Sequence, residues 1–259
     1  MKSTGTFCIL VTYMRISPLS RVVVCLPILM LAAMCAQAGT VFIQPIHVCD
    51  GAGANCGNSS ETLFEAEGDK IWAQAGISIF FLPWTSFNST SFQNLDENIG
   101  STTSLQALVN TPGNGANPNA LVLDFWFVTS IIAPGGGSAF GEAFLGDNGA
   151  AIADIVFSAG RIDTIYHELG HNLGLPHPDE SAPGCTTFVQ TQLMASGGCR
   201  TVPSNISQIT PSGTLDVLAA GEIATAQASP FDQAVPEPAT FGLLGAALLG
   251  VFAVRRRAA

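Results

Sequence analysis

Basic side chains are scarce in the middle of this 259-residue chain. Residues 39–234 contain only Lys70, Arg161 and Arg200 as basic residues against 18 acidic ones, a formal charge of −15. Such a surface repels nucleic acid and anionic lipid, which excludes both as partners of this segment. Acidic loops can hold a structural Ca²⁺ ion, and residues 147–149 are the candidate. They lack a complete calcium-loop pattern, so solvated surface charge is the simpler interpretation.

The chain also lacks an uninterrupted apolar run of the roughly 20 residues that an ordinary membrane span needs. A shorter run at residues 22–36 follows basic residues and precedes the small-x-small site Ala36-Gln37-Ala38. This pattern is typical of a secretory signal, so residues 1–38 are predicted to be cleaved on export. A membrane-anchoring helix is the alternative.

A second short apolar run, residues 241–254, lies between the segment VPEPAT and Arg255-Arg256-Arg257. The order of stiff linker, short transmembrane helix and basic stop orients the arginines toward the cytoplasm. Residues 235–259 resemble a PEP-CTERM sorting signal, which exosortases process in Gram-negative bacteria. The resemblance implies export to the cell surface or beyond, an exosortase-type processing partner, and membrane contact only through this tail. A simple tail anchor is the alternative.

Cysteine pairs of the Cys-x-x-Cys kind are missing from residues 39–234, which argues against a cysteine-bound zinc ion. The four cysteines of this segment are Cys49, Cys56, Cys185 and Cys199. An even number in an exported chain indicates two disulfides, for which three pairings exist. Proximity in the sequence favours Cys49–Cys56 and Cys185–Cys199.

Residues 39–234 are long enough for one domain with a sizeable core. Hydrophobic periodicity and turn residues predict both strands and helices in it. In chain order, the expected elements are a strand at 41–48, a helix capped by Ser60 and ended by Gly76, a buried strand at 77–82, a short helix at 104–109 and a central strand at 120–128.

A hairpin is predicted next, with strands at 139–144 and 151–157 and a turn at Asn148-Gly149 that supplies positive φ angles. The first of these strands is rich in glycine and alanine, so little side-chain bulk covers it. An extended peptide could add to such an edge through backbone hydrogen bonds. The candidate substrate-binding residues are Ala139, Phe140, Gly141 and Ala143.

Histidine is scarce too, and three of the four histidines lie in the segment HELGHNLGLPH, residues 167–177. On a helix, His167 and His171 lie one turn apart on the same face, so both imidazoles can bind one zinc ion at about 2.0–2.1 Å. Glu168 projects about 100° around the helix axis from His167. It therefore lies beside the ion, where it can accept a proton from bound water.

His177 lies beyond the reach of a continuing helix, which would carry it about 9 Å further along the axis. The chain must therefore leave the helix and fold back. Gly174 is placed where a left-handed residue would end the helix, and Pro176 prevents the helix from resuming. The sequence thus predicts a three-histidine zinc site with Gly174 as a structural residue.

The pattern His-Glu-x-x-His-x-x-Gly-x-x-His resembles the signature of the metzincin clan of zinc endopeptidases. The resemblance implies an α+β fold with a twisted mixed sheet, mostly parallel with an antiparallel edge strand, and an active-site helix. It also implies a small irregular C-terminal part that ends in a helix, here residues 214–227. A methionine turn is expected beneath the metal, and the segment around Met194 resembles it.

The subfamily stays open between matrixin-, reprolysin- and serralysin-like members. Pro178 resembles the serralysins. Ser196 occupies the position of a tyrosine in serralysins and astacins, which favours a matrixin- or reprolysin-like site.

Two functions fit these observations. The first is a secreted zinc-dependent endopeptidase that hydrolyses extended polypeptides with Glu168 as general base. The alternative is a non-catalytic cell-surface or extracellular-matrix protein that a metal stabilises. Glu168 favours the enzyme, because a structural zinc site needs ligands but no base.

Overall fold

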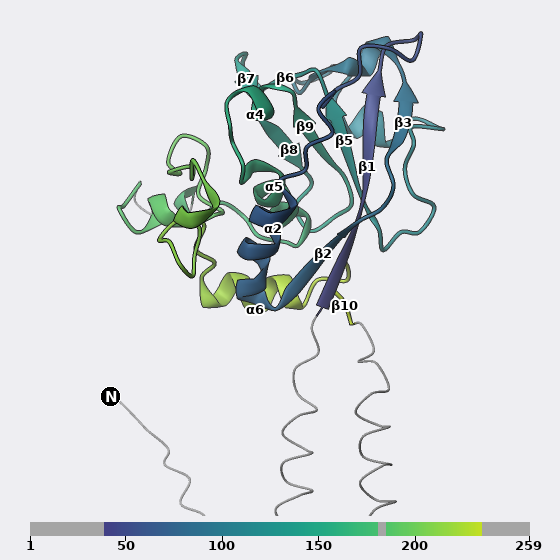
Figure 1. The fold of residues 1–259 in the computed structure, drawn as a ribbon. Coiled ribbons are helices and arrows are strands. Elements are labelled where there is room, and N and C mark those ends of the chain that lie inside the picture. The colour runs from purple at the N-terminus through teal and green to yellow at the C-terminus, as the bar shows by residue number, and fades with distance from the viewer. Residues whose placement is uncertain (1–38, 181–184, 235–259) are drawn as a thin grey trace, which may run out of the picture. The chain divides into compact units, whose positions relative to one another are not determined.

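The structure, a computed structural model, describes residues 39–180 and 185–234 (Figure 1). The predicted signal, residues 1–38, and the predicted sorting tail, residues 235–259, lie outside the described residues. Within the described part of the chain, every helix is too short or too polar to cross a membrane.

Strand β1 (Gly39–Cys49) organises the main sheet. One of its edges pairs in parallel with β2 (Ile77–Phe81) and, further along, with β3 (Thr85–Asn88). The other edge pairs antiparallel with the short β10 (Gln233–Ala234) and parallel with β5 (Leu123–Val128). Pro45, which has no N–H, lies in the gap between the β2 and β3 pairings, where no ladder bond is lost on that edge.

The far side of β5 pairs in parallel with β9 (Ala150–Ala153), and β8 (Gly141–Ala143) pairs antiparallel with β9 at the end of the strand order. All six residues of β5 are buried, as expected for a central strand, although β5 begins at Leu123 rather than at residue 120. The predicted α+β class is therefore confirmed, with a mostly parallel mixed sheet and an antiparallel edge strand.

The remaining elements are a three-stranded sheet and a set of short helices. The small sheet consists of β4 (Asn94–Asp96), β6 (Ser130–Ile132) and β7 (Ser138–Ala139). The α-helices are α2 (Glu65–Trp72), α3 (Leu105–Val109), α4 (Ile155–Ser158), α5 (Thr164–Asn172) and α6 (Ala220–Gln227). The 3₁₀ turns are η2 (Ala73–Ala75), η3 (Thr90–Gln93), η4 (Pro178–Glu180), η5 (Val189–Thr191) and η6 (Ile206–Gln208).

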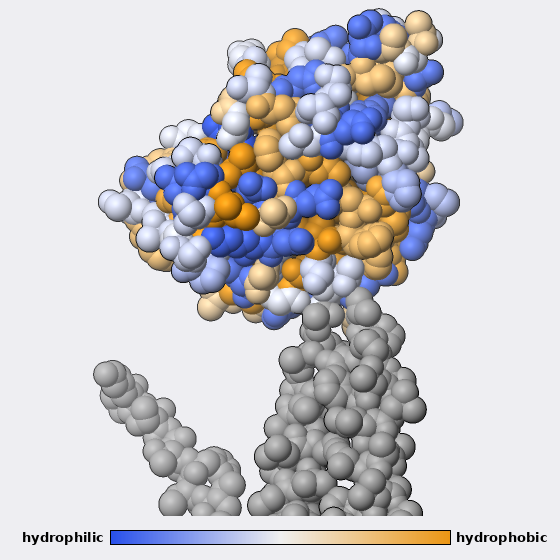
Figure 2. All heavy atoms as spheres, in the orientation of Figure 1, coloured by the Kyte–Doolittle hydropathy of each residue, from blue (hydrophilic) through white to orange (hydrophobic). Residues whose placement is uncertain are grey.

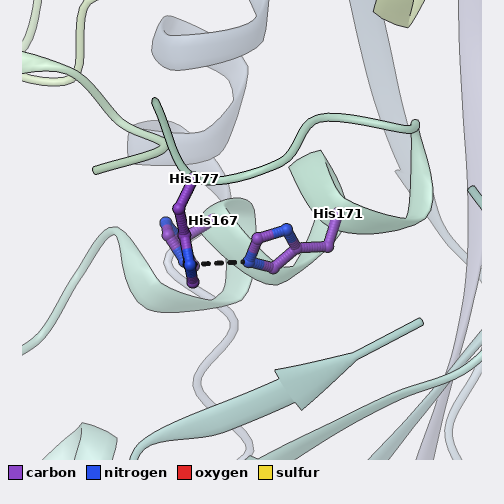
Figure 3. Close-up of side chains that lie close together, drawn as sticks. All are labelled: His167, His171 and His177. Atoms are coloured by element: carbon purple, nitrogen blue, oxygen red, sulfur yellow. Dashed lines mark hydrogen bonds between the residues drawn. The ribbon is translucent and has the colours of Figure 1, made fainter. Parts of the chain in front are cut away.

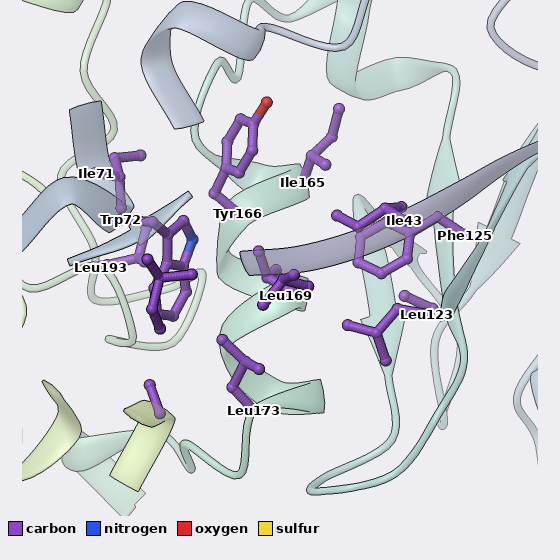
Figure 4. Close-up of a cluster of buried hydrophobic side chains, with 14 of the residues drawn as sticks. Ile43, Ile71, Trp72, Leu123, Phe125, Ile165, Tyr166, Leu169, Leu173 and Leu193 are labelled. Carbon is purple, nitrogen blue, oxygen red and sulfur yellow. The ribbon is translucent and has the colours of Figure 1, made fainter. Parts of the chain in front are cut away.

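Helix α5 packs its apolar side against the main sheet (Figure 4). Ile165, Leu169 and Leu173 lie in one buried cluster with Leu123 and Phe125 of β5. The opposite face of the sheet is covered by a second buried cluster that includes residues of α3. Because both faces are covered, burial of apolar side chains fixes the position of α5 against the strands.

Several predicted helices and strands begin or end at other residues than the sequence indicated. The first helix begins at Glu65 after Phe64, which is left-handed at φ 52 and provides no side-chain cap. Ser60 is not the cap because it lies five residues before the helix begins; its hydroxyl donates to Asn58 Oδ1. The end of this helical segment is as predicted, with Gly76 left-handed at φ 66.

Strand β2 is half exposed rather than buried, and Phe80 is 55% exposed. The strand lies on the outer edge of β1, and Figure 2 shows apolar residues on the surface over it. One face of β2 therefore packs on the core while the other meets solvent.

The predicted hairpin is confirmed in its pairing and wrong in its length. Strand β9 stops at Ala153 because its partner β5 stops at Val128, and residues 155–158 form α4 instead. Asn148 does not adopt positive φ; Gly146 and Gly149 do. The Asn148 side chain is held by Val122 O and the Asp124 carboxylate, which takes it out of the turn geometry expected for Asn-Gly.

The C-terminal helix begins at Ala220 rather than at residue 214. Leu215 and Val217 form isolated bridges with Ile209 and Gln192, which keeps the chain extended there. Glu222 accepts a hydrogen bond from Ala219 N at the start of the helix. The expected irregular part that ends in a helix is thus confirmed, with a shorter helix.

Candidate metal centre

Helix α5 carries the first two histidines and ends where the sequence predicts. Gly174 is left-handed at φ 92. Its N–H donates to His171 O, and Leu175 N donates to Gly170 O. This pair of bonds is a Schellman motif, which ends a helix at a left-handed glycine. The chain then turns back and brings His177 to the helix.

The three imidazoles point toward one another (Figure 3). The Nε2 atom of His177 lies 3.2 Å from Nε2 of His167 and 3.1 Å from Nε2 of His171. His167 is buried, while the other two rings are partly exposed at the site. Two residues of a helix and one residue of the following loop therefore meet at a single point.

The opposite nitrogen of each ring faces an oxygen. His167 Nδ1 lies 2.7 Å from Leu193 O, His171 Nδ1 2.7 Å from Leu175 O, and His177 Nδ1 2.9 Å from Glu180 Oε1. Carbonyl and carboxylate oxygens accept hydrogen bonds, so each Nδ1 carries the proton in a neutral ring and each Nε2 has a free lone pair.

A second proton, on Nε2 of His167 or His171, would replace one of the lone pairs that meet here. Burial opposes the positive charge that this proton would bring. Burial lowers the pKa of His167 well below its ordinary value, and burial followed by the neighbouring His177 lowers the pKa of His171 to about 4. With His167 and His171 neutral, the three converging Nε2 atoms leave a site that a cation completes.

The donor set fits zinc. Nitrogen ligands at about 2.0–2.1 Å in tetrahedral geometry lie about 3.3 Å from one another. The His177 Nε2 contacts of 3.1 and 3.2 Å are close to this spacing. Each ring also has the oxygen partner for its other nitrogen that metal-bound histidines have in most proteins. His167, His171 and His177 are therefore suited to hold one zinc ion.

Glu168 is buried next to His167 and lies against β8. A Cβ atom on Gly141 would lie 2.6 Å from Glu168 Oε1, so only glycine allows this approach. Burial raises the pKa of Glu168 to about 8, an effect that Arg200 opposes and Glu142 adds to. A carboxyl group with such a pKa can exchange a proton near neutral pH.

Met194 packs against α5 at Gly170. A Cβ on Gly170 would lie 2.3 Å from the Met194 sulfur, so the helix and the methionine contact directly at this glycine. Two residues further on, Ser196 donates from its N–H and its hydroxyl to the Asp179 carboxylate, at 2.8 and 2.6 Å. This carboxylate ties the loop that follows His177 to the turn that contains Met194.

Only part of the predicted substrate edge is free. Gly141 and Ala143 lie in β8 at the end of the sheet. Ala139, in contrast, belongs to β7 and pairs with Ile131 of the small sheet. Phe140, between the two strands, packs against the main core, and the Arg161 guanidinium lies 4.1 Å from its ring centre. The candidate edge therefore shortens to residues 141–143.

In the candidate calcium loop, residues 147–149, two carbonyl oxygens already accept hydrogen bonds from the protein. The carbonyl oxygens of Asp147 and Gly149 both accept hydrogen bonds from the side-chain amide of Asn172. Nothing in the described residues supports a Ca²⁺ ion there.

Both predicted disulfides, Cys49–Cys56 and Cys185–Cys199, are present.

Comparison with known proteins gives one match in sequence and several likenesses in structure. Residues 234–257 match the family described as PEP-CTERM protein-sorting motif. No curated protein matches the chain. The match supports the predicted sorting tail at nearly the predicted position.

Among the solved structures that are similar to the chain, three illustrate the likeness, all at low sequence identity. Archaemetzincin (AmzA) from Archaeoglobus fulgidus, complexed with malonate, is 19% identical, with a TM-score of 0.34, over 72% of this chain and 99% of that one. Mature mirolysin from Tannerella forsythia, in complex with a cleaved peptide, is 14% identical, with a TM-score of 0.43, over 73% and 90%. A chain in a chaperone–substrate complex is 13% identical, with a TM-score of 0.46, over 75% of this chain and 35% of its own length.

Sequence reasoning missed the polar residues that surround the histidines. Asp163, Arg200 and Asp216 are buried together near the start of α5. Arg200 carries a signal in the sequence, because it is one of only three basic residues in this segment. Asp163 and Asp216 carry no such signal, since they are two of the 18 acidic residues in the same segment.

Tyr166, adjacent to His167, faces away from the centre. Its hydroxyl donates to Leu63 O at 2.7 Å, and the residue is fully buried. It is therefore a core residue rather than a ligand.

Proposed function

We propose that this protein is an exported zinc-dependent endopeptidase of metzincin type. His167, His171 and His177 would hold the ion, and Glu168 would be the general base. The observation that carries the proposal is the convergence of three Nε2 atoms, with that of His177 3.1 and 3.2 Å from the other two, beside a buried carboxyl group.

Zinc in a three-histidine site supplies Lewis acidity, which polarises a carbonyl and lowers the pKa of water toward about 7. Glu168 would take the proton of the attacking water and later deliver it to the leaving amine. A nearby cation favours the carboxylate form of Glu168 and so lowers its pKa from the metal-free value of about 8. This shift favours a base that works at neutral pH.

An extended polypeptide is the proposed substrate. Strand β8 ends the sheet next to Glu168, and Gly141 has no side chain between its backbone and that carboxyl group. A peptide that added to β8 by backbone hydrogen bonds would therefore run close to the base. The substrate strand would lie along residues 141–143.

Export is proposed from both ends of the chain. The signal pattern of residues 1–38 would direct secretion, and the match of residues 234–257 to the sorting motif supports processing by an exosortase-type enzyme. Residues 39–234 would then form the catalytic domain.

The decisive experiment compares the purified protein with the variant Glu168→Gln. Zinc content is measured by elemental analysis, and cleavage of a denatured protein is followed with and without a chelator. The expected result is one zinc ion in both proteins and a loss of cleavage of about 10²–10⁴-fold in the variant, since the amide cannot accept a proton.

Two other results would contradict the proposal. A Gln variant with normal cleavage would remove Glu168 from the reaction. A native protein that binds zinc but cleaves nothing would support the alternative, a non-catalytic surface or matrix protein stabilised by its metal.

A further inference from the structure

The carbonyl oxygen of Leu193 accepts two side-chain hydrogen bonds. His167 Nδ1 lies 2.7 Å from it, and Arg200 donates to it from Nη1 at 2.9 Å. A carbonyl oxygen has two lone pairs, so both donors can bind at once. A single backbone atom therefore connects Arg200 to the first histidine of the metal centre.

The three histidines differ in how their Nδ1 partners are supplied. The partners of His171 and His177 are four and three residues away in the sequence, within the same turn of chain. Leu193 is 26 residues from His167 and lies in a segment without regular secondary structure. The Leu193 side chain is buried and its N–H donates to Val217 O at 3.2 Å, while Arg200 is the side chain besides His167 that binds the carbonyl oxygen itself.

Arg200 is itself held in place by an ion pair. Its side chain is 2% exposed, and Nε lies 3.2 Å from Oδ2 of Asp163, which is fully buried. Asp163 immediately precedes α5, the helix that carries His167. A guanidinium group is planar and charged, so one arginine can donate from Nη1 to the Leu193 carbonyl while its Nε side forms the ion pair with the Asp163 carboxylate.

A second buried carboxyl group balances the charge. Asp216 is 1% exposed, and burial, followed by the neighbouring Asp163 carboxylate, raises its pKa to about 8. Asp216 is thus mostly protonated at neutral pH. The cluster then contains one guanidinium and one carboxylate, which is the combination that a buried site tolerates.

We propose that Arg200 is a positioning residue of the metal centre, which holds the Leu193 carbonyl so that His167 presents Nε2 to the ion in the correct tautomer and orientation. The inference rests on the proposed zinc site. Oxygen partners of metal-bound histidines orient the ring, and loss of such a partner weakens metal binding about 10–100-fold in most sites. Arg200 does not contact His167 itself. Removing Arg200 would weaken metal binding indirectly, because the Leu193 carbonyl would then be freer to move.

The test uses Co²⁺ as a spectroscopic probe, titrated into the metal-free full chain. Arg200→Lys keeps the positive charge, but an ammonium group lacks the planar fork that contacts both the Leu193 carbonyl and the Asp163 carboxylate. We expect Co²⁺ to bind about 10-fold or more weakly, with a changed visible absorption spectrum. Lys70→Met is the matched control, because Lys70 also donates to a backbone carbonyl of the C-terminal part, Ile206 O, without any connection to the histidines. Its Co²⁺ affinity should equal that of the native protein.

An Arg200→Lys protein that is folded by circular dichroism and binds Co²⁺ with native affinity and spectrum would overturn the inference. If this variant does not fold, the double variant Asp163→Asn, Arg200→Met removes both buried charges, and the same loss of affinity is expected. Nitrogen-15 NMR of the metal-free native protein gives a readout without mutation. His167 should be protonated at Nδ1, and a proton at Nε2 would contradict the inference.

Failure of the zinc site itself would look different. A native protein that binds neither Zn²⁺ nor Co²⁺ would remove the proposed function, whereas native binding with an unaffected Arg200 variant would remove only the positioning role.

Discussion

The two parts of the chain on either side of the end of α5 are built differently. Residues 39–172 contain all but one strand of the main sheet, all of the second apolar cluster and most of the first. Residues 173–234 contain the helix α6, the two-residue strand β10 and otherwise short turns. We call these the sheet part and the loop part. The first is held by continuous strand ladders and apolar burial. The second has no comparable ladder: eight of its apolar residues, Leu193 and Met194 among them, lie in the first cluster, and separate polar contacts add to this burial.

Those polar contacts tie the loop part to the sheet part at single points. Lys70 donates to Ile206 O, and Gln74 donates to Asp216 O. Gln227 donates to Ala75 O. An individual hydrogen bond contributes about 0.5–1.5 kcal/mol, much less than a buried apolar cluster. Because the loop part lacks ladders and contributes the smaller share of the first apolar cluster, the comparison indicates that it opens more easily than the sheet part.

The candidate metal centre joins the two parts. The sheet part supplies His167, His171 and Glu168 on a helix fixed by its apolar side. The loop part supplies His177 and the Leu193 carbonyl. Metal binding should therefore stabilise the loop part far more than the sheet part, because an ion that binds only the assembled site adds its binding free energy to folding.

Metal removal should produce the largest effect. With a chelator present, amide hydrogen exchange should accelerate in the loop part by up to about 10³-fold, the equivalent of roughly 4 kcal/mol for a site filled at 1,000 times its Kd. Strands β1 and β5 should change little. Hydrogen exchange with mass spectrometry measures both. Equal acceleration in the two parts would show that they unfold as one unit.

Replacing Asp216 with asparagine should have the next largest effect, on the pH dependence of stability. The pKa of Asp216 is about 8 in the folded chain against an ordinary value of 3.8. Between these pH values the folded state holds a proton that the unfolded state has released, so wild-type stability falls as pH rises. An asparagine side chain does not titrate, and asparagine tolerates the left-handed backbone at this position, φ 54.

The free energy of unfolding of Asp216→Asn, relative to wild type, should therefore rise by about 2–4 kcal/mol from pH 4 to pH 8. Urea denaturation at several pH values measures it. Asp147→Asn is the control, because Asp147 lies on the surface. A difference between Asp216→Asn and wild type that does not change with pH would mean that Asp216 is ionised in the folded chain.

Replacing Gly170 with alanine should have the smallest effect on stability of the three changes. It tests the contact between the sheet part and the loop part at Met194. The new Cβ would meet the Met194 sulfur at 2.3 Å, so the loop part must shift away from α5. Such overpacking costs about 1–3 kcal/mol, and metal affinity should fall with it. Gly221→Ala is the control in α6, where a Cβ has open space. Thermal unfolding and Co²⁺ titration measure both, and a fully stable Gly170→Ala protein would show that Met194 moves freely.

The elements that the sequence predicts well are those with a strong local pattern. The strand β1, the central strand β5 and the helix α5 follow from apolar periodicity, and the end of α5 follows from Gly174. Where the predictions are wrong, a distant partner decides. Strand β9 stops where β5 stops, and the start of α6 moves because Leu215 and Val217 bridge to other segments.

The candidate site divides in the same way. His167, Glu168, His171 and His177 could be predicted from spacing alone, because a helix and one left-handed glycine bring them together. Arg200, Asp163 and Asp216 could not be predicted. Asp163 and Asp216 are 53 residues apart in the sequence, and no local pattern connects the three residues.

The sequence by itself therefore determined the three-histidine pattern and the main elements around it, β1, β5 and α5, and favoured the two disulfide pairs, because each depends on neighbours in the chain or on a regular repeat. Only the tertiary structure decided which carbonyl holds His167, which face of β8 lies against Glu168, and which buried carboxyl keeps its proton. These depend on desolvation and on contacts between distant segments, which appear only when the chain is folded.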